Sequence, residues 1–205
     1  MITVVGNLKG GTGKSTVVFN LALWLANAEQ QVTLCDLDPQ NTLRDAIDVR
    51  VEEGYEPTVS VFGSIPKKAH GNVIIDIGLS DMDAARNALS RADRVLIPVT
   101  PSQADVWATQ QFLTIIDEST RANPTKPEIY AFINRADTHP AASENAETQE
   151  VLKQIPGLAV MDHCLSQRMA FRRSFSEGLG VFELEPRGKA ALELNTLAET
   201  LYTDI

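Results

Sequence analysis

The residues best suited to chemistry form the run Lys-Gly-Gly-Thr-Gly-Lys-Ser-Thr at positions 9–16, directly after the apolar run Ile2–Val5. A glycine-rich loop between a strand and a helix directs several backbone N–H groups at one point, where they and the helix N-terminus bind phosphates. Lys14 can then reach the β- and γ-phosphates, and Ser15 can ligate Mg²⁺. We therefore predict a nucleotide-phosphate site formed by Gly10, Gly11, Thr12, Gly13, Lys14, Ser15 and Thr16.

This loop departs from the common phosphate-loop pattern at its first position. The pattern G-x-x-x-x-G-K-[ST] requires a glycine five residues before Gly13, where this chain has Leu8. The run fits instead a variant that carries a second lysine, Lys9, at its front. An ordinary phosphate loop has no role for that lysine, so Lys9 calls for a separate explanation.

Carboxylates follow or end two further apolar runs. Asp36 and Asp38 follow Val32–Cys35, and Asp76 lies near the end of Val73–Ile77. In an open α/β sheet, ligands bind at the carboxyl ends of the strands, so these side chains should lie near the phosphate loop. There, one carboxylate can orient Mg²⁺-bound water and another can position an attacking water.

The apolar runs belong to a regular alternation of strand-like and helix-like segments. The strand-like runs are continuous and rich in Val and Ile, as expected for a parallel sheet covered on both faces. Apolar residues recur at helical spacing between them, in segments 17–28, 104–115 and 194–201. We predict one domain over residues 1–205, an α/β fold with a doubly wound, mostly parallel sheet and helices on both faces. Strands are expected at Ile2–Val5, Val32–Cys35, Val73–Ile77, Val95–Val99 and Ile129–Ile133, with weaker candidates at Thr58–Phe62 and Leu158–Met161.

The loop, the carboxylates and the proline-containing turn at residues 98–105, where Ser102 can cap the next helix, resemble the ParA/MinD family of deviant P-loop ATPases. The resemblance spans nearly the whole chain, which is similar in size to small ParF-like partition proteins. It implies ATP and Mg²⁺ as cofactors. It also implies that the front lysine reaches across a dimer to the partner's nucleotide. The matching positions make Lys9, Lys14 and Asp38 catalytic, with Asp38 at the hydrolytic water, and place Ser15, Asp36 and Asp76 on the Mg²⁺ side.

Two loops leave questions open within this resemblance. Relatives often carry prolines soon after the position of Asp76, whereas this chain continues Ile77-Gly78-Leu79-Ser80, where Gly78 could sense the γ-phosphate through its N–H. The run Asn134-Arg135-Ala136-Asp137 also allows several readings. Asn134 matches the family's adenine-binding asparagine, but N-R-x-D also approximates the guanine-reading N-K-x-D of GTPases, and a loop asparagine can simply cap a turn. The other motifs favour ATP.

Charge is unevenly distributed along the chain. The net charge is −9, so the molecule as a whole should repel nucleic acid and anionic membranes, and DNA binding requires a local basic patch. The C-terminal region offers one on a predicted helix, where Arg168 and Arg172 should share a face and Phe171 and Phe175 should anchor it. Candidate DNA contacts are Arg168, Arg172, Arg173 and Lys189, with Lys67 and Lys68 as further candidates; the alternative is a solvated helix face.

The expected function is that of an ATPase that dimerises on ATP, binds DNA nonspecifically and positions a cargo, such as a plasmid, a chromosome region or a protein assembly. The resemblance implies a ParB-like or other adaptor protein that stimulates hydrolysis. With two isolated cysteines, no apolar run of membrane-spanning length and no visible secretory signal, we expect a cytoplasmic, nucleoid-associated protein.

Two other classes share the deviant loop. A MinD-like membrane-cycling regulator would need a basic amphipathic C-terminal helix, whereas residues 199–205 are acidic, which favours a protein without a membrane partner. An iron–sulfur protein of the nitrogenase type would need two suitably placed cysteines. Cys35 lies in a predicted strand, which leaves Cys164 alone.

Overall fold

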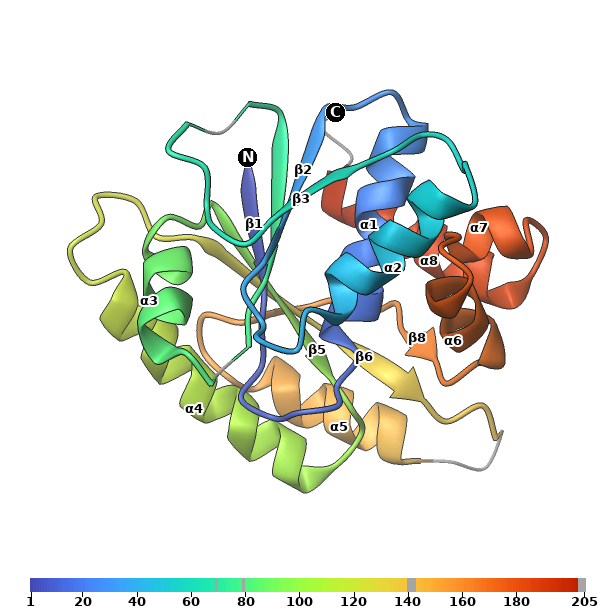
Figure 1. Cartoon of the computed structure of the whole chain (residues 1–205). Coiled ribbons are helices and arrows are strands. Elements are labelled where there is room, and N and C mark those ends of the chain that lie inside the picture. The colour runs from blue at the N-terminus through green and yellow to red at the C-terminus, as the bar shows by residue number, and fades with distance from the viewer. Residues whose placement is uncertain (69, 79, 140–142, 203–205) are drawn as a thin grey trace.

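One parallel sheet forms the centre of the computed structural model, which describes residues 1–68, 70–78, 80–139 and 143–202 (Figure 1). The eight-stranded sheet has the order β3-β2-β4-β1-β5-β6-β7, and β8 pairs with β6 off this path. Every pairing in the described ranges is parallel. The strands are β1 Ile2–Val5, β2 Val32–Asp36, β3 Ser60–Phe62, β4 Asn72–Asp76, β5 Arg94–Val99, β6 Glu128–Ala136, β7 Ala159–Val160 and β8 Leu165–Ser166.

Helices cover both faces of this sheet, which confirms the doubly wound α/β fold (Figure 1). Successive strand residues point to opposite faces, so Val4 enters one hydrophobic cluster and Val5 the other. One face carries α1 Lys14–Asn27, α2 Thr42–Glu52, α6 Met169–Ser176, α7 Val181–Leu184 and α8 Lys189–Tyr202. The other face carries α3 Met82–Ser90, α4 Gln103–Ser119 and α5 Glu144–Lys153.

The expected strands are present, with shifted ends. The central runs form β1, β2, β4 and β5 almost as predicted, while the weaker candidates shorten to the three residues of β3 and the two of β7. β6 extends through Ala136, three residues further than expected, because it continues past the sheet core to pair with β8. The two-residue β8 was not predicted, since a pair of residues carries no periodic signal.

The buried face of α4 differs from the expected apolar stripe. Ala104, which the helical spacing assigned to the core, is exposed. The buried residues are Asp105, Val106, Thr109, Phe112 and Ile116. Two polar side chains are buried because they find partners: the Thr109 hydroxyl donates to the Asp105 carbonyl at 2.8 Å, and the Asp105 carboxylate accepts from Lys9 and Ser102.

Strand register brings the predicted functional segments to one edge of the sheet. Val5 of β1 pairs with Asp76 at the end of β4, and Asp76 pairs with Asp36 at the end of β2. The phosphate loop leaves β1 at the same level. The central strand order thus places the loop beside both carboxylate-bearing strand ends.

Candidate nucleotide-binding site

The phosphate loop has the backbone conformation that its glycines allow. Gly11 and Gly13 have φ values of 76° and 84°, a left-handed region that other residues rarely enter. α1 begins at Lys14, so the first N–H groups of the helix face the loop. Asn7, which sequence reasoning did not single out, is fully buried and supports the loop: its Nδ2 donates to Pro98 O at 2.9 Å, and its Oδ1 accepts from Lys9 N at 3.1 Å.

Asp76 presents an unpaired carboxylate below this loop. The residue is fully buried, and neither carboxylate oxygen has a hydrogen-bond partner among the residues that the structure describes. Burial raises the pKa of Asp76 to about 6, against the lowering effects of nearby Ser15 and Lys14. A buried, unsatisfied carboxylate calls for a water or cation as its missing partner. This environment fits a Mg²⁺ bound through water.

Asp36 differs from Asp76 because backbone groups occupy its oxygens. Oδ1 accepts from Asp38 N and Oδ2 from Arg44 N, both at 3.2 Å. Burial raises the pKa of Asp36, and these two hydrogen bonds oppose the rise. Asp36 therefore stabilises the turn that leads from β2 to α2.

Asp38 lies against the segment that follows Asp76. A Cβ added to Gly78 would come within 2.8 Å of Asp38 Cγ, so the carboxylate occupies the space that a side chain would fill. Asp38 Oδ1 also accepts from Gln40 N at 3.0 Å. The predicted switch glycine and the predicted hydrolytic carboxylate are thus direct neighbours. Leu79, within the predicted switch, lies outside the described residues.

Lys9 is held by its own chain. Its Nζ forms an ion pair with Asp105 Oδ2, and Ser102 Oγ donates to the same oxygen. The Lys9 side chain is 43% exposed, whereas the Asp105 side chain is completely buried. Ser102 caps α4, as predicted, by accepting from Asp105 N at 3.2 Å. Sequence reasoning treated this turn as structural and missed Asp105, since an acidic residue in a first helical turn carries no further signal.

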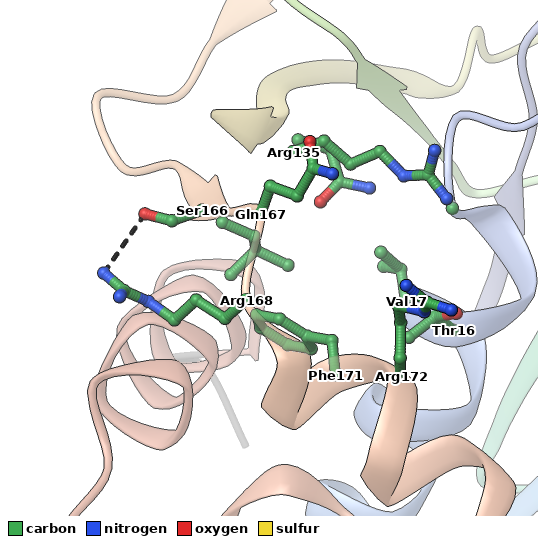
Figure 2. A pocket seen from close by; sticks show the side chains of 11 residues that line it. Thr16, Val17, Arg135, Ser166, Gln167, Arg168, Phe171 and Arg172 are labelled. Carbon is green, nitrogen blue, oxygen red and sulfur yellow. Dashed lines mark hydrogen bonds between the residues drawn. The ribbon is translucent and has the colours of Figure 1, made fainter. Parts of the chain in front are cut away.

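Asn134 closes one side of the phosphate loop. It is 7% exposed, and its Nδ2 donates to Thr12 O at 2.6 Å. Beside it opens a cavity of about 200 Å³, whose lining residues come from the start of α1, the end of β6, and the stretch from β8 to the first turn of α6 (Figure 2). They include Gly13, Thr16, Val17, Asn134, Arg135, Gln167, Phe171 and Arg172. The cavity lies directly beside the phosphate loop, since Gly13 and Thr16 help to line it.

The basic segment is arranged differently from the prediction. α6 begins at Met169, and Arg168 precedes it with an extended backbone, so Arg168 and Arg172 do not share a helix face. Arg168 instead pairs with Glu193 of α8 at 2.6 Å, with 24% of its side chain exposed. Arg168 is thus the residue before the first turn of α6, and its acidic partner lies 25 residues further along the chain.

The rest of the basic segment lies on the surface. Arg172, Arg173 and Lys189 are exposed, and Arg173 is 3.5 Å from both Glu177 and Glu185. Phe175 anchors α6 as expected, with its ring 5.3 Å from that of Phe19 in α1.

Within the described ranges, no group of three or more His, Cys, Asp or Glu side chains could hold a metal ion unaided. No helix in the same ranges has the length and hydrophobicity of a membrane span.

The parallel sheet, the glycine-rich loop and the adjoining carboxylates define a P-loop nucleotide-binding protein. The family model for the CobQ/CobB/MinD/ParA nucleotide binding domain matches residues 3–181, and the chain belongs to that family.

Proteins similar to this chain have roles in partition and positioning. The maintenance of carboxysome distribution protein A of Halothiobacillus neapolitanus is 29% identical over 199 residues, covering 92% of this chain and 90% of that protein. Protein ParA of Rhizobium radiobacter is 35% identical over 130 residues, 59% of this chain and 58% of that protein. A putative plasmid partition protein from Borrelia burgdorferi bound to AMPPNP shares the fold, with a TM-score of 0.76, 18% identity and coverage of 100% and 99%.

Proposed function

We propose that this chain is an ATPase that dimerises on ATP, binds DNA nonspecifically in that state and positions a cargo. The observation that carries the proposal is the pair of lysines that frames one phosphate loop. Lys14 opens α1 and serves the nucleotide of its own chain, while Lys9 stands at the loop's front with a half-exposed side chain. A second lysine with an accessible side chain suits a phosphate group supplied from outside the chain, as the family resemblance implies.

Asn134 and the motifs around the phosphate loop together favour ATP. The Nδ2 of Asn134 donates one of its two hydrogens to Thr12 O, which leaves the second hydrogen and Oδ1 for the adjoining cavity. Oδ1 can accept from the exocyclic amino group of adenine, while the second Nδ2 hydrogen can be donated to a ring nitrogen of the base. We therefore propose ATP as the nucleotide.

The proposed hydrolytic roles follow from position and charge. Lys14 and the loop N–H groups would hold the β- and γ-phosphates, and Ser15 with Asp76 would hold Mg²⁺ directly or through water. Mg²⁺, when bound, neutralises charge on the phosphates. Asp38 would orient the attacking water, and its contact with Gly78 would link that orientation to the switch segment. Asp36 would act through the turn that it holds, on the Mg²⁺ side.

DNA binding would use the exposed cations of the C-terminal segment. Arg172 and the α1 residue Thr16 line the same cavity, so nucleotide binding and the basic segment share a boundary (Figure 2). Arg172, Arg173 and Lys189 can contact phosphates without reading sequence, while Arg168 must first leave Glu193. A dimer would carry this patch twice, which doubles the number of DNA phosphates that it can contact.

A protein assembly is the cargo that we would test first. The carboxysome-distribution relative covers nearly the full length of this chain, whereas the match to Protein ParA covers little over half of it. Partition of a plasmid or chromosome region is the other candidate. In either case, an adaptor protein would stimulate hydrolysis. We propose a cytoplasmic, nucleoid-associated location because DNA is the proposed surface.

Binding to an arbitrary DNA duplex at moderate salt, compared without nucleotide and with ADP, ATP and GTP, tests the proposal. We expect binding with ATP alone and a loss of affinity in an Arg172→Ala/Arg173→Ala variant. The matched control is Arg86→Ala/Arg121→Ala, which removes two arginines elsewhere. Absence of DNA binding under every condition would refute the DNA-dependent part, and equal binding with GTP would refute the role given to Asn134.

A further inference from the structure

The ion pair between Lys9 and Asp105 joins two loops that lie far apart in the sequence. Lys9 belongs to the loop after β1, and Asp105 lies in the first turn of α4, after β5, the neighbour of β1 in the sheet. Both Lys9 Nζ and Ser102 Oγ converge on Asp105 Oδ2. The contact therefore ties the front of the phosphate loop to α4.

The two partners of this ion pair are in very different environments. Asp105 is completely buried, and its Oδ1 has no hydrogen-bond partner among the described residues. Burial raises its pKa, but the hydrogen bonds from Lys9 and Ser102 prevail and hold the pKa below its usual range. Lys9, by contrast, has 43% of its side chain exposed to solvent. If it left, the buried carboxylate would lose its counter-charge, which is strongly unfavourable.

We propose that Asp105 is a positioning residue for Lys9: it holds the lysine in a resting position, and ATP-dependent pairing of two chains has to break this ion pair. This inference rests on the proposed function, since it takes a phosphate group on another chain as the new partner of Lys9. The exchange replaces a carboxylate by a phosphate as the anion that Lys9 contacts. Asp105 would thus make pairing dependent on bound ATP.

The resting position can be tested without nucleotide, by the rate at which an amine-acylating reagent modifies Lys9, measured by mass spectrometry against exposed Lys67 as internal reference. In an Asp105→Asn variant we expect the ratio to rise at least about threefold, because a charge-assisted hydrogen bond is lost. The matched control is Glu118→Gln, which removes a carboxylate on the same helix from a surface ion pair with Arg86 and should leave the ratio unchanged. An unchanged ratio in Asp105→Asn would overturn the proposal.

The second readout is the dissociation constant of the ATP-state dimer, measured by sedimentation in an Asp38→Ala background to suppress hydrolysis. Asp105→Asn should tighten the dimer about tenfold, since the competing ion pair is gone. A purely structural role for Asp105 predicts the opposite, a weaker or unchanged dimer, and either result would overturn the proposal. If neither the Asp38→Ala protein nor its Asp105→Asn variant dimerised with ATP, the proposed function would be refuted. The acylation rates would still show whether Asp105 restrains Lys9.

A thermal-unfolding cycle keeps the proposal testable if Asp105→Asn folds poorly. Lys9→Met should lower Tm, because it leaves the Asp105 carboxylate buried without its cation. Adding Asp105→Asn to Lys9→Met should recover much of that loss. Additive effects of the two substitutions would show that the side chains are not coupled and would overturn the proposal.

Discussion

Lys14 is the side chain that we propose as the main charge on the β- and γ-phosphates of the nucleotide. It begins α1 directly after Gly13, whose left-handed backbone turns the loop toward the helix. Lys14→Ala should weaken ATP binding at least about a hundredfold, because it removes the charge that meets the β- and γ-phosphates. Titration with a fluorescent ATP analogue would measure this, with Lys126→Ala as a surface control. Unchanged affinity would contradict the phosphate-loop assignment.

Asp76 should destabilise the nucleotide-free protein at neutral pH. Its pKa is raised from 3.8 to about 6 by burial, so the folded state holds the proton more tightly than the unfolded chain. As pH rises from about 4 to about 6, the unfolded chain loses this proton first, and the contribution of Asp76 to the free energy of unfolding falls. Above a pH of about 6, the whole cost of burying the charged carboxylate destabilises the folded state.

Asp76→Asn should therefore make the nucleotide-free protein more stable at pH 7.5, by about 1 to 3 kcal/mol. The difference from wild type should disappear near pH 4. Urea unfolding between pH 4 and 8 measures both quantities, and Asp83→Asn, at an exposed position, is the control. A gain that does not change with pH would show that Asp76 is not the titrating group.

Gly78 lies in the segment that follows β4 and contacts Asp38. The volume that an alanine Cβ would need is filled by the Asp38 carboxylate, at 2.8 Å from Cγ. Gly78→Ala should displace Asp38 and slow ATP hydrolysis at least about tenfold, with nucleotide binding retained. Steady-state hydrolysis and binding measured together separate the two effects. Gly63→Ala, where the nearest atom is 4.0 Å away, should leave both unchanged; full activity of Gly78→Ala would remove the role given to this contact.

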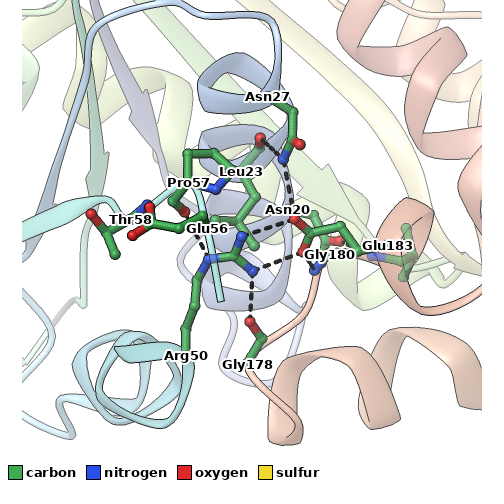
Figure 3. Close-up of polar contacts among 11 residues, drawn as sticks. Asn20, Leu23, Asn27, Arg50, Glu56, Pro57, Thr58, Gly178, Gly180 and Glu183 are labelled. Atoms are coloured by element: carbon green, nitrogen blue, oxygen red, sulfur yellow. Dashed lines mark hydrogen bonds and ion pairs between the residues drawn. The ribbon is translucent and has the colours of Figure 1, made fainter. Parts of the chain in front are cut away.

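At the scale of elements, one buried arginine fastens the nucleotide side of the fold to its C-terminal helices. Arg50 of α2 is fully buried, and its guanidinium forms a two-pronged ion pair with Glu183 of α7 at 2.8 and 2.9 Å. It also donates to Pro57 O and Gly178 O, both at 2.9 Å (Figure 3). Asn20 of α1 accepts from Val181 N at 2.8 Å. The helices after the phosphate loop and after Asp38 are thus both tied to α7.

Arg50→Ala should lower the free energy of unfolding by about 3 to 5 kcal/mol, because Glu183 and two backbone carbonyls lose their shared partner in a buried setting. Chemical denaturation measures this loss. Arg86→Ala breaks an ion pair of the same kind at the surface, where the side chains are 42% and 43% exposed, and should change stability by less than about 1 kcal/mol. Equal losses in the free energy of unfolding for the two substitutions would show that burial does not strengthen the contribution of Arg50 to stability.

At the scale of the whole molecule, apolar runs and loop motifs were sufficient to predict the sheet and the edge at which Asp36, Asp38 and Asp76 meet. The unpredicted features depend on partners distant in sequence. The buried Asp105 is ion-paired with Lys9, 96 residues away, and Arg168, which precedes α6, is ion-paired with Glu193. Reasoning from neighbouring residues alone predicts that each of these charged side chains is exposed to solvent. Arg50 was missed for the same reason.

The central claim is that ATP pairs two chains through the lysines at the front of their phosphate loops. The most direct test is the mass of the Asp38→Ala protein in solution, measured by sedimentation without nucleotide, with ADP and with ATP. We predict a monomer in the first two conditions and a dimer with ATP, and a monomer in all three once Lys9→Ala is added. A protein that stays monomeric with saturating ATP, or whose dimer is unaffected by Lys9→Ala, would contradict the account.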